Sequence, residues 1–163
     1  MDTYNQGLDM LVRLYNLAPE KSVPEDISIR QAMPLEKTKV LNWVLNEFGS
    51  SWADEVSMCF SGHPITCFLA IHHGKIIGFS AYDGTRPGFF GPLGVNSIYQ
   101  RKGLGAALAA KALHHMHAQG YAYAVVGWVS PENQGFFKHH FEAMAIESSS
   151  PLQSAYKGML IER

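Results

Sequence analysis

The sequence has few cysteines, almost no net charge and no long apolar run. Its two cysteines, Cys59 and Cys67, form no CxxC pair, so a disulfide framework is excluded and two reduced thiols are expected. Thirteen basic residues are balanced by 14 acidic ones, without the basic excess that is typical of duplex-binding domains. No stretch approaches the ~18 uninterrupted apolar residues that a bilayer span needs, and no signal-peptide pattern is visible. We therefore expect a cytoplasmic protein that binds neither nucleic acid nor membrane.

The composition that remains is that of a globular domain. The chain has 163 residues, of which 47% are hydrophobic and 17% are charged. This length fits one domain with a single core, and the apolar share is high enough to exclude wholesale disorder. We therefore expect all local sequence patterns to belong to one folded domain.

The order of the predicted elements indicates an α/β or α+β fold with a mixed sheet. Alternation of apolar and polar residues begins a strand at Ile27, and an apolar stripe after Pro34 predicts a helix that ends at Gly49. Two β-rich runs joined by a short polar turn, residues 65–71 and 76–82, predict a hairpin. A short helix at 50–60 is predicted before this hairpin. After it come a strand at 89–95, whose glycines and proline indicate a bulge or an edge, a helix at 104–119, a strand at 121–129 and a helix that begins near Ser130. Such an order requires a sheet covered by helices.

The two ends of the chain complete this prediction. Residues 7–17 carry apolar side chains at i, i+3, i+4 and i+7, which predicts a short helix, and a linker with two prolines follows. We therefore divide the chain into an N-terminal helix and linker at 1–26 and a domain at 27–163. Two closing strands are predicted at 145–148 and 156–161.

Residues 100–105, Gln-Arg-Lys-Gly-Leu-Gly, are the most informative segment because they put two glycines at the start of a helix. The first amides of a helix have no partner within it, and the helix dipole adds positive charge there. Gly103 and Gly105 cost the helix about 1 kcal/mol each relative to alanine, but they let an anion approach the backbone. Arg101 and Lys102 add charge and donors. The segment predicts a cradle for a pyrophosphate.

The same two glycines are also compatible with a purely structural role. A plain strand-to-helix turn, in which glycine eases close packing, is the commoner reason for a lone GxG. A Walker P-loop is excluded because GxxxxGK[ST] is absent, and a Rossmann fingerprint is excluded because Leu108 replaces its third small residue. The segment alone therefore leaves a turn and an anion cradle as alternatives.

Residues 93–108, LGVNSIYQRKGLGAAL, resemble the acetyl-CoA-binding signature of the GNAT superfamily of N-acetyltransferases, and residues 120–128 and 133–144 are similar to its second cofactor-contacting strand and helix. The resemblance, which covers roughly residues 27–161, implies a single strongly twisted mixed sheet of about six to seven strands, flanked by helices, with two strands splayed around pantetheine. The cofactor-binding residues that it implies are Leu93, Gly94, Val95, Gln100, Arg101, Lys102, Gly103, Leu104, Gly105, Ala106, Asn133 and Phe137.

One residue departs from the family pattern. In the family a tyrosine often protonates the leaving thiolate from the position that Phe137 occupies here, and a phenyl ring cannot donate a proton. The residues that could take over this role by their chemistry are Tyr156, Tyr82, Ser130 and His139, among which Tyr156 is our candidate.

Acceptor-site candidates come from the second helix and from the hairpin. Trp52 and Tyr82 are candidate substrate-binding residues, although core packing is the usual role of aromatics. Asp54 and Glu55 could attract an ammonium group or accept its proton, and we take Glu55 as the candidate base; a solvated helix start explains both acids equally well. The paired histidines come with no HExxH or CxxC spacing, so we expect no metal.

The expected function is transfer of an acetyl group from acetyl-CoA to a primary amine of a small molecule or peptide by direct attack. Two alternatives stay open: a catalytically weak CoA-binding regulatory module, which Phe137 suggests, and an interaction domain that binds no CoA. A homodimer is also left open.

Overall fold

The computed structural model describes residues 6–161, which form one seven-stranded sheet flanked by four α-helices. The strand order is β2-β3-β4-β5-β6-β1-β7. The strands are β1 (Leu8–Arg13), β2 (Ile27–Gln31), β3 (Cys67–His72), β4 (Lys75–Tyr82), β5 (Phe89–Val95), β6 (Tyr123–Val129) and β7 (Met144–Ala145). The helices are α1 (Lys37–Phe48), α2 (Ser50–Met58), α3 (Leu104–Ala118) and α4 (Pro131–Phe141). Every strand pair is antiparallel except β5 and β6, so the sheet is mixed, as predicted.

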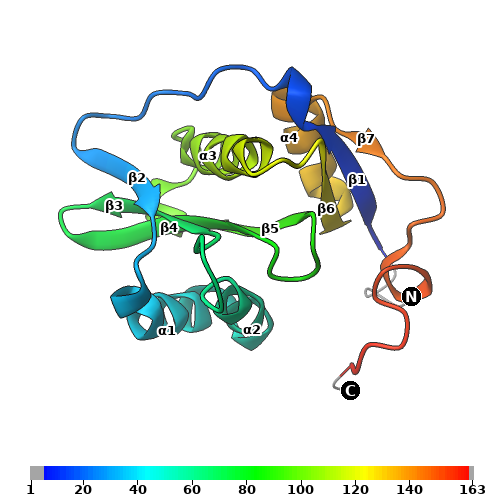
Figure 1. Ribbon diagram of the computed structural model, residues 1–163, viewed down its shortest axis with the longest axis horizontal. Coiled ribbons are helices and arrows are strands. Elements are labelled where there is room, and N and C mark those ends of the chain that lie inside the picture. The colour runs from blue at the N-terminus through cyan, green and yellow to red at the C-terminus, as the bar shows by residue number, and fades with distance from the viewer. Residues whose placement is uncertain (1–5, 162–163) are drawn as a thin grey trace.

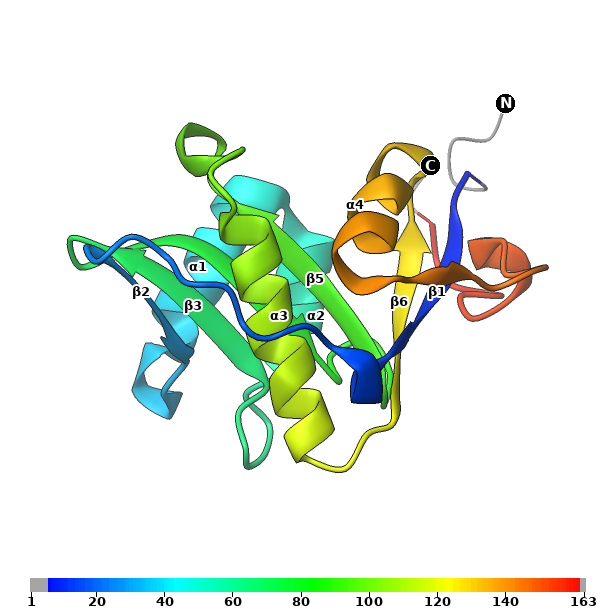
Figure 2. The same ribbon diagram turned by 90° about the horizontal axis from the view of Figure 1, so that it is seen from above.

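The helices cover both faces of the sheet (Figure 1). α1 and α2 lie on one face, and α3 and α4 lie on the other. α3 is buried on most sides because its alanines let it approach the sheet closely and because the segment between β1 and β2 crosses over it (Figure 2). His114 on α3 is hydrogen-bonded to the carbonyl of Ala18 in that segment, at 2.7 Å. None of the described helices is long and apolar enough to cross a membrane.

The sheet splits between β5 and β6, as the resemblance implied. The two parallel strands pair only at Phe89 and Phe90, opposite Val125 and Val126, and then diverge toward their carboxyl ends. The pairing of β5 with β4 also shifts register between Ser80 and Tyr82, which confirms the bulge predicted from the glycines and proline of β5. The split is open at the carboxyl end of β5, and the loop that leads to α3 begins there.

The helix predicted for residues 7–17 is wrong, because these residues form β1 and a short 3-10 turn. β1 inserts between β6 and β7, and its Met10 and Val12 are fully buried in the core. The apolar residues at i, i+3 and i+4 fit a helical stripe as well as a buried strand. The pairing with β6, at least 110 residues away along the chain, decided the outcome.

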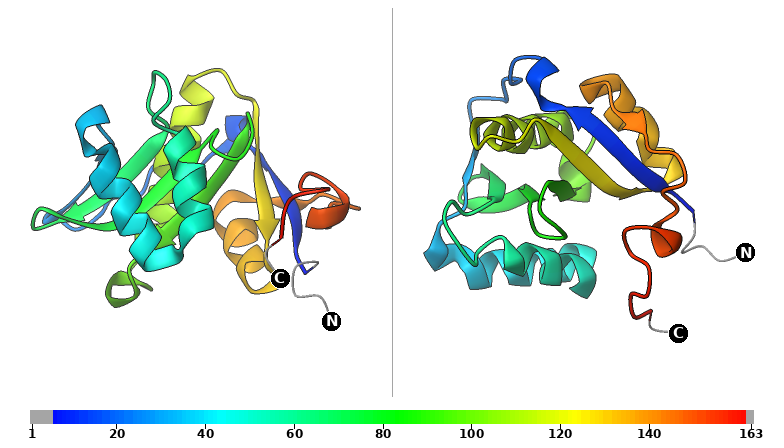
Figure 3. Two further views of the ribbon diagram at one scale, coloured as in Figure 1. Left: turned by 90° about the horizontal axis from the view of Figure 1, so that it is seen from below. Right: turned by 45° about the vertical axis from the view of Figure 1, so that its right-hand side comes forward.

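The closing strands are also largely wrong. Within residues 142–161, Met144–Ala145 alone forms a strand, and it pairs with β1. Among the described residues, the segment at 156–161 contains no strand; a 3-10 helix at Pro151–Gln153 and further turns precede it. The amide of Tyr156 donates to the carbonyl of Pro151 at 3.0 Å, so this segment folds back on itself and lies beside β6 and β1 (Figure 3).

Candidate active site

The loop between β5 and α3 has a defined shape that its own side chains stabilise. The side-chain amide of Gln100 donates to the carbonyl of Val95 at 3.0 Å, and Asn96 Oδ1 accepts from the amide of Ile98 at 3.0 Å. Arg101 and Gly103 both adopt positive φ, at 62° and 80°. The first hydrogen bond of α3 runs from the amide of Ala107 to the carbonyl of Gly103, so the amides of residues 104–106 have no partner within the helix.

The two glycines of this loop do not serve close packing within the protein. A Cβ on Gly103 would meet no atom within 4 Å, and glycine is favoured there because of its left-handed backbone. A Cβ on Gly105 would meet only the ring of Phe136 on α4, at 3.8 Å. Arg101 and Lys102 are exposed beside this opening. The helix start is thus open, electropositive and free of side chains. These properties suit a phosphate group.

Tyr99 anchors the same loop, and sequence reasoning missed it. Its ring packs against the cluster that contains Leu104 and Leu108 of α3. Its hydroxyl is 2.7 Å from Nδ1 of His72, and the ammonium of Lys102 lies 5.6 Å from its ring centroid. Tyr99 therefore connects the loop to the tip of the β3–β4 hairpin, a contact across 27 residues that no local pattern predicts.

The other predicted cofactor residues lie around the split. Leu93 and Val95 pack toward α3, in the cluster that Leu104 and Leu108 form, whereas Gly94 is buried under Phe48 of α1. Asn133 lies exposed in the first turn of α4 and donates to Ser130 Oγ at 3.0 Å.

Phe137, another predicted cofactor residue, has a buried side chain. It is 7% exposed, and its ring centroid lies 6.1 Å from that of Phe90 on β5. The side chain thus fills the core between α4 and the closed end of the split. Its neighbour Phe136 is the ring that faces Gly105.

On the opposite face of the sheet, Glu55 of α2 lies in a partly buried position. Thr85, in the loop between β4 and β5, donates a hydrogen bond from its hydroxyl to Oε2 of Glu55. Burial raises the pKa of the Glu55 carboxyl above its ordinary value, and the Thr85 hydrogen bond opposes that rise only in part. Such a carboxylate is a stronger base than an exposed glutamate.

Tyr156 comes from the C-terminal segment and lies against β6 on this side of the split. Its hydroxyl occupies the space into which a Cβ on Gly127 would point, next to the ring of Phe89. Arg86 fixes the segment by donating to the carbonyl of Ala155 at 2.6 Å. Burial raises the pKa of Tyr156, and the charges of Asp9 and Glu55 raise it further. The hydroxyl therefore stays protonated and lies within electrostatic reach of both carboxylates.

Asp9 supports this arrangement from β1. The β1–β6 register shifts between Leu8 and Met10, and Oδ1 of Asp9 accepts from the amide of Trp128 at 2.9 Å across that irregularity. Trp128 has a φ of 53° there, and its ring lies 4.9 Å from that of Tyr156. Sequence reasoning missed Asp9 because the apolar spacing around it predicts a helix outside the domain.

Several predicted residues are not brought to this site. Trp52 packs in the core under the sheet, with its ring centroid 5.0 Å from Phe48 and 6.1 Å from Phe79. Tyr82 is 1% exposed, and its hydroxyl is 2.6 Å from Nδ1 of His115 on α3. His139 is exposed on α4, and Asp54 is exposed on α2. Of the predicted catalytic residues, Glu55 lies near enough to Tyr156 for its charge to raise the pKa of the Tyr156 hydroxyl.

Solved structures share this architecture at low sequence identity. A GCN5-related N-acetyltransferase from Sphaerobacter thermophilus superposes with a TM-score of 0.68 at 19% identity, over 85% of this chain and 48% of its own. A glucosamine N-acetyltransferase region of a fungal multi-domain β-N-acetylglucosaminidase gives 0.66 at 14% identity, over 86% and 20%. A GCN5-related N-acetyltransferase from Kribbella flavida gives 0.62 at 14% identity, over 86% and 54%.

These similarities establish the fold. This chain spans about half or less of the length of those proteins. A search of the curated proteins found no match. The model of the acetyltransferase (GNAT) family, however, matches residues 33–141. This range includes both the split between β5 and β6 and the loop before α3. The chain belongs to the GNAT family of acetyltransferases, whose cosubstrate is acetyl-CoA.

Proposed function

We propose that this protein transfers the acetyl group of acetyl-CoA to a primary amine by direct attack of the amine on the thioester. The observation that carries the proposal is the placement of two groups along the split: an open, electropositive helix start follows its open end, and Tyr156, whose pKa the charge of Glu55 raises, lies at its closed end beside Phe89 and Gly127. Cofactor and acceptor would enter from opposite faces and meet at the closed end of the split.

The cofactor would be held mainly by backbone. The diphosphate fits the free amides at the start of α3, where Arg101 and Lys102 add charge. Pantetheine fits the gap between β5 and β6, with strand-like hydrogen bonds to the backbone near Leu93 and Val95. Asn133, exposed in the first turn of α4, would contact the cofactor as well. Binding in this way places the thioester near Phe89 and Gly127, because the split closes there.

Glu55 is the proposed base. An amine reaches the site as an ammonium ion, and the carboxylate both attracts it and takes its proton. Because the pKa of Glu55 is raised, it lies closer to the pKa of the ammonium group, and the proton transfer is less unfavourable. The neutral amine then forms a bond to the carbonyl carbon of the thioester.

Tyr156 is the proposed acid. When the tetrahedral intermediate collapses, the C–S bond breaks and the sulfur takes the electron pair, while the Tyr156 hydroxyl donates its proton to the thiolate. After the attack, the nitrogen still carries one proton more than the amide needs. That proton passes to the Tyr156 phenolate, while Glu55 releases the ammonium proton to solvent, so the enzyme returns to its starting state. This assignment compensates for Phe137, which has no proton to give, by supplying a hydroxyl from the other face of the sheet.

A thiol-release assay with acetyl-CoA and a panel of primary amines tests this function. The panel includes an amino sugar, because one structural relative is named as a glucosamine N-acetyltransferase region. We expect amine-dependent release of CoA with at least one acceptor, together with the acetylated amine by mass spectrometry. Saturable binding of acetyl-CoA by calorimetry without amine-dependent release would instead support a regulatory module, and no binding would refute both functions.

A further inference from the structure

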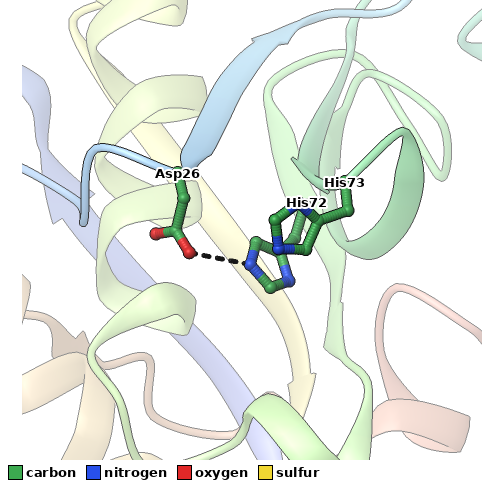
Figure 4. Close-up of side chains that lie close together, drawn as sticks. All are labelled: Asp26, His72 and His73. Atoms are coloured by element: carbon green, nitrogen blue, oxygen red, sulfur yellow. Dashed lines mark hydrogen bonds and ion pairs between the residues drawn. The ribbon is translucent and has the colours of Figure 1, made fainter.

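Two histidines and an aspartate meet on the surface, away from the split. Asp26 precedes β2, and His72 and His73 form the tip of the β3–β4 hairpin (Figure 4). Oδ2 of Asp26 lies 2.8 Å from Nε2 of His72. One donor atom from each of the three residues lies within 4.8 Å of the other two. Among residues 6–161, this is the one group of three such donors that lies this close together.

The hairpin turn is what brings the second histidine to this group. His73 and Gly74 are the two central residues of the turn, with φ of 50° and 72°, which is the geometry of a type I′ turn. Consecutive residues of a strand would point to opposite faces. Here the left-handed backbone of His73 places its ring 3.9 Å from that of His72, centroid to centroid. A ring nitrogen of His73 therefore lies within 4.8 Å of the donor atoms of His72 and Asp26.

The environment of His72 is that of a metal ligand. One ring nitrogen points at the Asp26 carboxylate, and the other is 2.7 Å from the Tyr99 hydroxyl. Histidines that bind metals usually make such a hydrogen bond with their second nitrogen, which fixes the ring orientation. His72 is partly buried, whereas Asp26 and His73 are exposed, so solvent can complete the coordination.

We propose that Asp26, His72 and His73 bind a transition-metal ion of the Zn²⁺ type. Two imidazoles and one carboxylate suit Zn²⁺, Cu²⁺ or Ni²⁺, and they disfavour Mg²⁺ and Ca²⁺, which require oxygen ligands. Zn²⁺ with three protein ligands takes water in its fourth position. The distance of 2.8 Å between the Asp26 oxygen and the His72 nitrogen needs only a small opening for both atoms to contact one ion.

The proposed site departs from our expectation from the sequence, which was that no metal would bind. That expectation rested on spacing within the chain, and Asp26 is 46 residues from His72. Another histidine pair at neighbouring positions, His139 and His140 on α4, joins no such group among the described residues. It therefore provides a matched control.

The test is calorimetric titration of the untagged protein with Zn²⁺ alone in a buffer that does not chelate metals. We expect one saturable site in the wild type and no binding of Mg²⁺. His73→Asn and Asp26→Asn should each weaken Zn²⁺ binding at least about tenfold. Asparagine tolerates the left-handed conformation, so His73→Asn preserves the turn. His139→Asn should leave Zn²⁺ binding unchanged.

Nuclear magnetic resonance of the imidazole nitrogens keeps the proposal testable if a variant misfolds. In the wild type, one molar equivalent of Zn²⁺ should shift the ring nitrogens of His72 and His73 and leave those of His139 in place. The proposal is overturned if the wild type shows no saturable binding, if both ligand variants bind Zn²⁺ as the wild type does, or if His139→Asn causes the same loss. These readouts are independent of acetyl transfer, so their failure leaves the proposed function untouched.

Discussion

The two sides of the split are built in different ways. The proposed cofactor side is formed mainly by a single stretch of chain, residues 93–106, which offers the backbone amides at the start of α3 and the exposed charges of Arg101 and Lys102 beside them. The acceptor side gathers individual side chains from β1, α2, the β4–β5 loop, β6 and the C-terminal segment. We infer that the cofactor side tolerates most substitutions that add no bulk or negative charge. The acceptor side should lose function whenever one functional group is removed. Cofactor affinity and turnover should therefore respond to separate sets of variants.

The largest effect is expected on the cofactor side from Gly105→Glu. A carboxylate at the start of α3 would take the place of the diphosphate and repel it, so we expect acetyl-CoA binding to fall below detection by calorimetry. Gly105→Ala is the matched control. Its Cβ has room beside Phe136, and it should add up to about 1 kcal/mol to the free energy of unfolding. Unchanged affinity in the glutamate variant would remove the diphosphate assignment.

Tyr156→Phe should lower kcat by about 10²- to 10⁴-fold, the usual contribution of general acid catalysis. It removes a single oxygen and keeps the ring, so the KM for acetyl-CoA should stay at the wild-type value. Steady-state kinetics with both substrates varied separates the two constants. A rise in that KM with no loss of kcat would show that Tyr156 binds cofactor and donates no proton.

Glu55→Gln should remove the low-pH limb of the kcat/KM profile. The raised pKa of Glu55 means that the carboxyl takes up its proton at a higher pH than an exposed glutamate does. Activity of the wild type should therefore fall as the pH drops toward that pKa, because the base becomes protonated. The glutamine variant should be slower by at least about tenfold and should lack this fall. If the glutamine variant still lost activity at low pH in the same way, the base would be a group other than Glu55.

The smallest effect is expected from Tyr99→Phe, which breaks the link between the cofactor loop and His72. A hydrogen bond of this kind contributes about 0.5–1.5 kcal/mol, so the KM for acetyl-CoA should rise about 2- to 10-fold while kcat stays constant. Tyr82→Phe also removes a hydroxyl bonded to a histidine, but in the core, and it should leave that KM unchanged. Equal effects of the two variants on KM would contradict a local role for Tyr99.

The difference between the two sides also explains what could be predicted from the sequence. Local patterns predict the strands and helices from Ile27 to α4, and a contiguous motif predicts the split and the loop at Gly103. The fold and the family were therefore predicted correctly. The acceptor side depends on contacts between distant segments. The apolar spacing of β1 fits a helix as well as a strand, and so Asp9 was missed. The chemistry of Trp52 and Tyr82 suits an acceptor pocket, but packing placed both in the core.

The most direct test of the proposed mechanism is a crystal structure of the protein with CoA. We predict that the diphosphate oxygens accept hydrogen bonds from the amides at the start of α3, residues 104–106. We also predict that the thiol lies in the split near Gly127 and within reach of the Tyr156 hydroxyl. A diphosphate bound elsewhere on the protein, or a thiol that points away from Tyr156 and Glu55, would contradict the mechanism.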